Sequence, residues 1–286
     1  PLNDKSAKYE SEFSVDGSAV FRMTKGAIST ELTVFVPPDE PTGVYLLTVK
    51  NGADSSMRMK VSPYFQMVLG FMPEKSGPLG GRYDKELNTL FYQNPRNIFR
   101  SGAAFVSMSI PGERVETRRG RFFGSDGEIA RPFMVRSGKP DVTQLTDDAQ
   151  IAGLLGTVEI PARGERTIAI IPGQADNMKE ACAIIRKYKD VNIAKASLDD
   201  TRRWWLSLMG TVKVETNQPE FDRYQNWLKY QALAERIWAR RGFYQTSGAY
   251  GFRDQLQDTV NLIWVDPALA RKQIILHASQ QFIQGD

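Results

Sequence analysis

The sequence TVEIPARGERTIAIIPG, residues 157–173, marks the point where the chain changes from one kind of secondary structure to another. Residues 157–160 and 166–171 are rich in β-branched and apolar side chains, and the five residues between them contain proline and glycine. This pattern predicts a β-hairpin. After Pro172-Gly173 the apolar residues recur at helical spacing instead. The stretch therefore predicts a β domain followed by helices.

Upstream of the hairpin, short strand-like segments separated by turns extend from about residue 9. The clearest are ISTELTVFV (28–36), which Pro37-Pro38 ends, and VYLLTVK (44–50), which Asn51-Gly52 ends. Residues 57–61 alternate apolar and polar, which predicts the return strand of a hairpin with residues 44–50. Many short strands without intervening helices predict an antiparallel β-sandwich. Further strands are predicted at residues 64–71, 89–93 and 103–110, and GPLGG (77–81) is predicted to be a loop.

Downstream, two helices are predicted between residues 175 and 216, with Asp176 as the N-cap of the first. Adjacent side chains on a helix diverge by about 100°, so Trp204-Trp205 indicates packing between the sandwich and the downstream helices rather than a sugar platform. Asn217-Gln218-Pro219-Glu220 has the layout of a capping box. Helices are predicted at about residues 217–241, 252–264 and 267–282, with apolar groups on more than one side, as in buried helices.

The predicted organisation is a β-sandwich domain at residues 1–174, a helical linker at 175–216 and, at 217–286, the start of a larger helical domain. Apolar, charged and aromatic fractions of 41%, 24% and 10% in 286 residues are those of a globular protein. We expect both ends to be interior points of a longer polypeptide. A chain ending at Asp286 would then expose apolar helix faces and tend to aggregate.

Composition excludes several classes of function. The net charge is +4, and the one basic cluster, Arg114 to Arg121, also contains the acidic residue Glu116. This cluster indicates a solvated strand or loop edge and not a nucleic-acid-binding surface. Cys182 is the only cysteine, so there is no internal disulfide and a reducing compartment is expected. His277 is the only histidine and lies in an apolar helical run, which favours a structural imidazole over a metal ligand or base. No apolar run is long enough to span a bilayer.

The stretch SGAYGFRDQLQD, residues 247–258, is the candidate functional segment. If a helix begins near Phe252, the side chains of Asp254, Gln257 and Asp258 share one face, and Arg253 lies beside them in the first turn. Carboxylates and amides bind adjacent hydroxyls in pairs, so this face suits a sugar ring. The alternative is a capping and salt-bridge cluster at a helix start.

Together with Tyr230-Gln231, the block GAYGFRDQLQD resembles the inverting disaccharide phosphorylases of glycoside hydrolase family 94, which include cellobiose and chitobiose phosphorylases. The sequence FRDQLQD within this block is most similar to the branch of the family that contains β-1,2-oligoglucan phosphorylases and the phosphorylase-like domain of cyclic β-1,2-glucan synthases. The segments GAISTELTVFVPPDEP and IPGQADNMKEACAIIRKY are also similar to that branch, so the resemblance covers most of the chain. It implies an antiparallel β-sandwich, linker helices and the first helices of an (α/α)6 barrel.

The resemblance implies transfer of a glucosyl unit from a β-glucan oligosaccharide to inorganic phosphate, with phosphate as co-substrate and no cofactor or metal. Arg253 and Asp258 match residues that line the subsite for the transferred sugar, and Asp254 and Gln257 are their neighbours. Tyr250 and Phe252 either pack beside the sugar ring or anchor the loop. The family's general acid falls later than Asp286, so these residues alone are expected to be inactive.

The implied partners are a β-linked glucooligosaccharide, phosphate, the remainder of the same polypeptide and a second copy in a homodimer. The implied location is the cytoplasm, or the cytoplasmic face of the inner membrane if the parent is a glucan synthase. Three alternatives stay open: a non-catalytic carbohydrate-binding or scaffold module, the phosphorylase-like domain of a membrane-bound cyclic β-glucan synthase, and an adhesion sandwich with an incidental helical tail.

Overall fold

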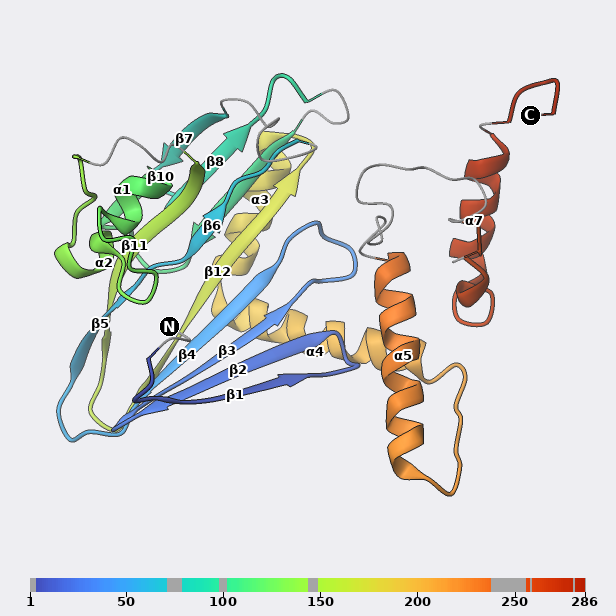
Figure 1. The fold of residues 1–286 in the computed structure, drawn as a ribbon, viewed down its shortest axis with the longest axis horizontal. Helices are drawn as coiled ribbons and strands as arrows, with labels where there is room; N and C mark the ends of the chain where they lie inside the picture. Colours follow the sequence, from blue (N-terminus) through green and yellow to red (C-terminus); the bar gives the residue numbers. More distant parts are fainter. Residues whose placement is uncertain are drawn as a thin grey trace. The chain divides into compact units, whose positions relative to one another are not determined.

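The computed structural model describes residues 4–70, 79–97, 102–143, 149–237, 256–257, 259–279 and 281–285. An antiparallel β-sandwich is followed by helices, which confirms the predicted order of β then α (Figure 1). The chain forms two compact units, Pro1–Thr201 and Arg202–Asp286.

The first unit contains a large antiparallel sheet of eight strands in the order β1-β2-β3-β4-β12-β9-β8-β7. The hairpin predicted between residues 157–160 and 166–171 is wrong, although both segments are strands: β11 (Gln150–Ile160) pairs with β10, β5 and β6 of the other sheet, whereas β12 lies in the middle of this one between β4 and β9. The strand bounds are β1 Lys8–Phe13, β2 Ser18–Lys25, β3 Ile28–Phe35, β4 Val44–Asn51, β7 Gly80–Asp84, β8 Thr89–Gln93, β9 Ala103–Met108 and β12 Glu165–Ala175.

A smaller sheet packs on one face of the large one. It consists of β10 (Arg114–Arg118), β11 (Gln150–Ile160) and β5 (Met57–Val61), and β6 (Tyr64–Gln66) also pairs with β11. Side chains from both sheets fill the space between them, including Val61 and Leu154 from the small sheet and Leu90, Val106 and Ile168 from the large one. Figure 1 shows the small sheet in front of part of the large sheet.

The other face of the large sheet is covered by helices. Phe35, Leu46 and Phe105 of the sheet pack with Ile185 and Tyr188 of helix α3, which lies behind the sheet in Figure 1. Helix α3 spans Met178–Lys189 and α4 spans Val191–Met209. The side chain that caps α3 belongs to Asn177, which accepts the Glu180 N–H at 2.9 Å, so the predicted N-cap Asp176 is wrong by one residue.

The predicted hairpin between residues 44–50 and 57–61 is wrong, because β4 pairs with β3 and β12 whereas β5 pairs with β11 of the other sheet. The chain crosses from the large sheet to the small sheet between β4 and β5, and Asn51, which is buried at the end of β4, fixes this crossing. Its amide nitrogen donates to the Ser55 and Pro161 carbonyls at 2.8 and 3.1 Å, and its amide oxygen accepts the Ala53 N–H at 3.0 Å. These bonds direct the chain away from β4 and into the small sheet.

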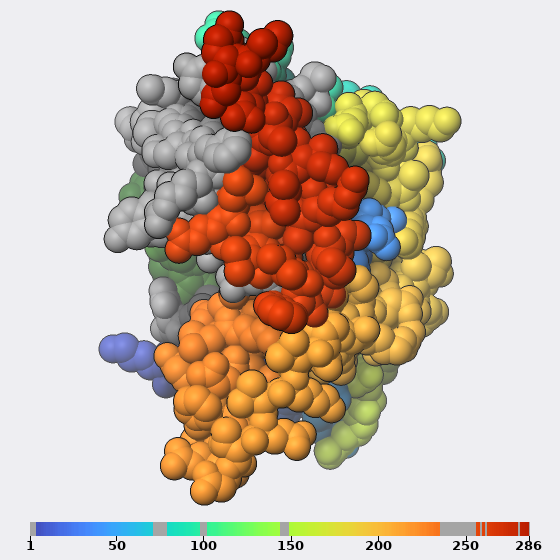
Figure 2. All heavy atoms as spheres, turned by 90° about the vertical axis from the view of Figure 1, so that its right-hand side faces the viewer, coloured from blue at the N-terminus to red at the C-terminus, as the bar shows by residue number. Residues whose placement is uncertain are grey.

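The second unit contains the end of α4, helix α5 (Pro219–Ile237), a 3-10 turn η3 (Val260–Leu262) and helix α7 (Pro267–Ala278), coloured orange to red in Figure 2. The described part of this unit exposes many large apolar side chains, in its helices and in the segments beside them, as the sequence predicts for the start of a larger helical domain. They include Phe221, Tyr224, Leu228, Val260, Ile263, Trp264, Ile274, Ile275, Leu276, Phe282 and Ile283.

Candidate functional site

Helix α5 carries the Tyr230-Gln231 pair and is fixed at its start by a local cap. The carboxylate of Asp222 accepts hydrogen bonds from the Thr216 backbone N–H at 3.1 Å and from the Thr216 hydroxyl at 2.8 Å. Thr216 lies just before the predicted capping box at residues 217–220, and its hydroxyl oxygen accepts the Gln218 N–H at 3.1 Å. Glu220, the predicted reciprocal partner of Asn217, instead forms an exposed ion pair with Arg223 at 3.1 Å.

Half-way along α5, two consecutive residues tie this helix to the end of α4. The Lys229 Nζ donates to the Met209 and Val212 carbonyl oxygens at 2.5 Å each, which satisfies acceptors at the C-terminal end of α4. Burial lowers the pKa of the Lys229 ammonium. The Tyr230 ring lies 4.9 Å from the ring of Trp205, which is 1% exposed.

The aromatic cluster is larger than sequence reasoning predicted. The rings of Trp204 and Trp205, which helical geometry predicts to diverge, instead meet edge to face, with ring planes at 83° and centroids 5.0 Å apart. Trp227, three residues before Tyr230, stacks at 31° and 5.4 Å. The helical spacing of residues 227 and 230 predicts that both rings lie on one face of α5, and this contact agrees with it. The cluster fixes the orientation of Tyr230, and the next residue, Gln231, is exposed.

Within the candidate segment the structure describes Leu256 and Gln257, which are helical. The 3-10 turn η3, which follows the segment, contacts α5. Thr259 and Leu262 are 2% and 1% exposed, whereas Gln257 is exposed. A packed side and a solvent-accessible side are what a helix needs to hold polar groups toward a ligand. Of the predicted site residues, Tyr250, Arg253, Asp254 and Asp258 lie outside the described residues, as does Phe252.

His277 has the structural role predicted for it. It is buried in α7, and its Nδ1 lies 2.9 Å from the Gln273 carbonyl oxygen and 3.0 Å from the Gln273 side-chain amide. In the part of the chain that the structure describes, no group of three or more His, Cys, Asp or Glu side chains could hold a metal ion. A search of those same residues finds no helix long and apolar enough to cross a membrane.

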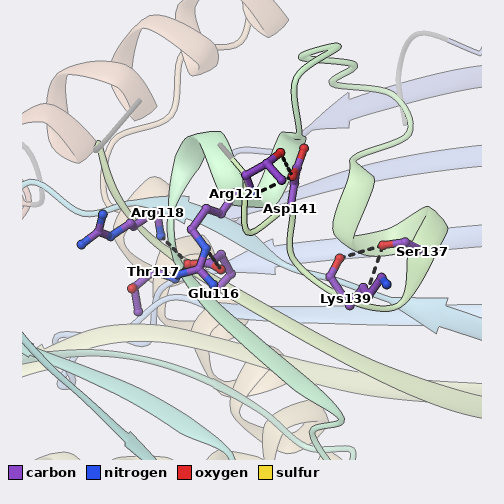
Figure 3. Close-up of polar contacts among 8 residues, drawn as sticks. Glu116, Thr117, Arg118, Arg121, Ser137, Lys139 and Asp141 are labelled. Carbon is purple, nitrogen blue, oxygen red and sulfur yellow. Dashed lines mark hydrogen bonds and ion pairs between the residues drawn. The ribbon is translucent and has the colours of Figure 1, made fainter. Parts of the chain in front are cut away.

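The basic cluster at residues 114–121 is also structural. Figure 3 shows the carboxylate of Glu116 turned inward at the junction of β10 and helix α1 (Arg119–Phe123), where it accepts the backbone N–H groups of Thr117 and Arg118 at 2.8 and 3.0 Å. Its other oxygen lies 3.3 Å from the Arg121 Nε. Glu116 is 5% exposed, so the prediction of a solvated edge is wrong at this residue.

The same corner of the sandwich includes the second short helix, α2 (Phe133–Ser137), and the loop that comes after it. Asp141 donates its backbone N–H to the Arg121 carbonyl at 2.8 Å, and its carboxylate accepts the Thr143 hydroxyl at 2.6 Å. This hydrogen bond holds the pKa of Asp141 below its usual value. These contacts tie the loop to α1 and leave Asp141 and Arg121 engaged within the fold.

One small cavity opens on the sandwich beside Asn94, Asn97 and Gln174, with a volume of about 50 Å³. A few waters fit such a space. Pockets for small organic ligands start at about 300 Å³, so this cavity is too small for a sugar ring.

The two units match two parts of one family. A model of the glycosyl hydrolase 94 supersandwich domain matches residues 1–191, and a model of the glycosyl hydrolase 94 superfamily catalytic domain matches residues 204–286. The chain belongs to glycosyl hydrolase family 94. The catalytic-domain match contains both Tyr230-Gln231 and the whole segment 247–258.

Among curated proteins, this family 94 chain is 35% identical over 288 residues to the cyclic β-(1,2)-glucan synthase NdvB of Rhizobium meliloti, covering 99% of the chain and 10% of that protein. It is 23% identical to a 3-O-β-D-glucopyranosyl-β-D-glucuronide phosphorylase of Paenibacillus borealis, covering 96% and 36%. With an N,N′-diacetylchitobiose phosphorylase of Vibrio furnissii the identity is 22%, covering 89% and 33%. The chain thus spans between a tenth and about a third of the length of these relatives.

A solved structure from the human microbiome, assigned as a kojibiose phosphorylase, superimposes with a TM-score of 0.54 over 96% of this chain and 36% of that one. The sequence identity is 10%, so this likeness supports the fold alone. It is consistent with the order of β-sandwich and helices described above.

Proposed function

We propose that this chain is part of an inverting glycoside phosphorylase that transfers a glucosyl unit from a β-linked glucooligosaccharide to inorganic phosphate. The observation that carries the proposal is the catalytic-domain match over residues 204–286, because this range contains the block GAYGFRDQLQD. Two of the relatives that match along most of the chain are named phosphorylases of β-linked or chitobiose sugars.

In the proposed site, Arg253 and Asp258 hold the sugar ring that is transferred, with Asp254, Gln257 and Tyr250 beside them. Transfer through an oxocarbenium-like transition state requires a rigidly held ring, and hydrogen bonds to its hydroxyls strengthen as positive charge develops. The described framework supports such rigidity. Thr259 and Leu262 are buried directly after Asp258, and α5 beneath them is fixed by Lys229 and the aromatic cluster.

Phosphate, as the attacking group, takes the place of the base-activated water of an inverting hydrolase. One general acid then suffices to protonate the leaving oxygen. We assign that role to no residue of this chain. Asp254 and Asp258 are proposed to bind hydroxyls, and His277 is bonded to Gln273 within its own helix.

The phosphorylase-like domain of a membrane-associated cyclic β-glucan synthase is a second candidate. The higher identity to NdvB, 35% over 99% of the chain, favours it over a free-standing phosphorylase. In both cases residues 247–258 bind a β-glucan. The proposed location is the cytoplasm or the cytoplasmic side of a membrane. A homodimer is proposed for either form.

The test is to incubate the polypeptide that contains this chain with β-1,2-linked glucooligosaccharides and inorganic phosphate. Phosphorus and proton NMR should show α-glucose 1-phosphate, since attack on a β-glucoside with inversion gives the α-anomer. Product must require both phosphate and oligosaccharide. Calorimetric binding of the oligosaccharide without any turnover would favour a binding or scaffold module. A β-anomer or free glucose as the first product would contradict the inverting phosphorylase.

A further inference from the structure

Helix α5 follows α4 through a link, residues 210–218, in which every residue is exposed. Because no side chain of this link is buried, the link by itself does not fix the angle between the two helices. The ring of Trp205 in α4, which is 1% exposed, contacts the ring of Tyr230 in α5. Burial of apolar surface is non-directional, so it brings the helices together without selecting one orientation.

Lys229 makes the directional contact between the end of α4 and α5. Its Nζ donates to the carbonyl oxygens of Met209, the last residue of α4, and of Val212 in the link. Among the described residues no carboxylate pairs with this ammonium, and a cation is stabilised by the unpaired carbonyls at the C-terminal end of a helix. Charge-assisted hydrogen bonds are directional and about twice as strong as neutral ones. Two of them, to carbonyls three residues apart, fix where α5 lies against the end of α4.

The orientation of α5 matters for the candidate segment because of the order of the chain. Residues 247–258 lie between α5 and η3, and η3 contacts α5. Thr259 directly after the segment is 2% exposed and Leu262 in η3 is 1% exposed. The elements before and after the segment therefore belong to one packed pair, and a displacement of α5 moves that pair.

We propose that Lys229 is a positioning residue for the sugar-binding segment: its two hydrogen bonds set the orientation of α5, and α5 in turn sets the orientation of residues 247–258. This inference rests on the proposed function, since it takes that segment to hold the transferred sugar. The Lys229 ammonium is engaged by two carbonyls and acts through the segment. A displacement of about 1 Å at a reacting centre can cost about a hundredfold in rate, so loss of the two bonds should lower turnover while the fold persists.

The test compares three variants of the full polypeptide. Lys229→Met keeps a side chain of similar length and removes the charge and the donors, whereas Lys229→Arg keeps both. Lys213→Met is the matched control, because Lys213 is an exposed lysine in the link between the same two helices. Phosphorolysis of a β-1,2-linked glucooligosaccharide is measured at a temperature at which calorimetry shows every variant to be folded.

We expect K229M to lower kcat/KM by at least about tenfold, K213M to retain the wild-type value and K229R to recover most of the loss. The KM for the oligosaccharide should rise while the KM for phosphate stays unchanged, a difference that general destabilisation would not produce. Wild-type kcat/KM in folded K229M would overturn the proposal. A K229R variant as impaired as K229M would also overturn it, because charge and donors would then not be what positions the segment.

Hydrogen exchange separates this inference from the proposed function, because it requires no turnover. The backbone N–H groups of Ile263, Val265 and Asp266 donate to carbonyls of η3, and in K229M they should exchange at least about threefold faster than in the wild type and in K213M. Unchanged exchange in K229M would overturn the positioning role. Faster exchange in K229M, combined with a wild-type polypeptide that phosphorolyses no oligosaccharide, would support the tie between Lys229 and η3 and refute the proposed function.

Discussion

Replacement of Asn51 by alanine tests why the chain crosses from one sheet to the other. The substitution removes two donors to the Ser55 and Pro161 carbonyls and the acceptor of the Ala53 N–H, at a site that is 3% exposed. At about 1 kcal/mol for each lost hydrogen bond, and without water to replace the partners fully, we expect a loss of about 3 kcal/mol.

For a unit of this size, about 3 kcal/mol corresponds to a decrease in melting temperature of roughly 6–12 °C. Differential scanning calorimetry of the N51A variant measures it directly. Asn192→Ala is the control, because Asn192 is exposed on α4 and its replacement should change stability by no more than about 0.5 kcal/mol. A decrease of less than about 1 kcal/mol in N51A would refute the assignment of Asn51 as the anchor of the crossing.

Three further changes test other parts of the sandwich. Tyr92→Phe removes a hydrogen bond from the buried hydroxyl to a backbone carbonyl of β11 and should cost about 1–2 kcal/mol in chemical denaturation. Burial raises the pKa of Tyr92, so absorbance titration should show one fewer ionisation-resistant tyrosine in the variant than in the wild type. The Thr143 hydroxyl lowers the pKa of Asp141, so its contribution to stability is present above the unfolded value near 3.8 and is lost as the pH falls through the folded one. Acid unfolding of Asp141→Asn should therefore have a shallower pH dependence than wild type, and an identical slope would contradict the contact. Gly173→Ala places a Cβ 2.5 Å from the Phe105 ring and should cost about 1–3 kcal/mol, whereas a melting temperature equal to wild type would show that the core yields there.

Sequence reasoning predicted the strands whose side chains alternate and are β-branched, including residues 28–36, 44–50 and 57–61. It predicted strand-like segments from about residue 9 but did not delimit β1 and β2, because KYESEF and SAVFRMTK mix charged and apolar residues in a way that only the pairing with β3 makes clear. It placed β5 beside β4 because Asn51-Gly52 is typical of a tight hairpin. The structure uses the same asparagine as a buried anchor, and such a role depends on carbonyls more than 100 residues away.

For the candidate site, too, features set by neighbouring residues were predicted from the sequence, whereas contacts between residues far apart in the sequence were not. Helical spacing predicted α5, α7 and the structural imidazole of His277. The tie between Lys229 and the end of α4, and the contact between Trp205 and Tyr230, join residues about 20 positions apart and have no local signature. The sugar-binding roles of Arg253 and Asp258 rest on the family's motif and stay predictions.

The central claim is that Arg253 and Asp258 hold the sugar ring that is transferred. The most direct measurement is phosphorolysis of a β-1,2-linked glucooligosaccharide by the full polypeptide carrying Asp258→Asn, with Glu215→Gln as the control, because Glu215 is exposed in the link before α5. We predict that D258N lowers kcat/KM by at least about a hundredfold, the loss expected for hydrogen bonds that strengthen in the transition state, while E215Q retains wild-type turnover. Wild-type kcat/KM in a folded D258N enzyme would contradict the account.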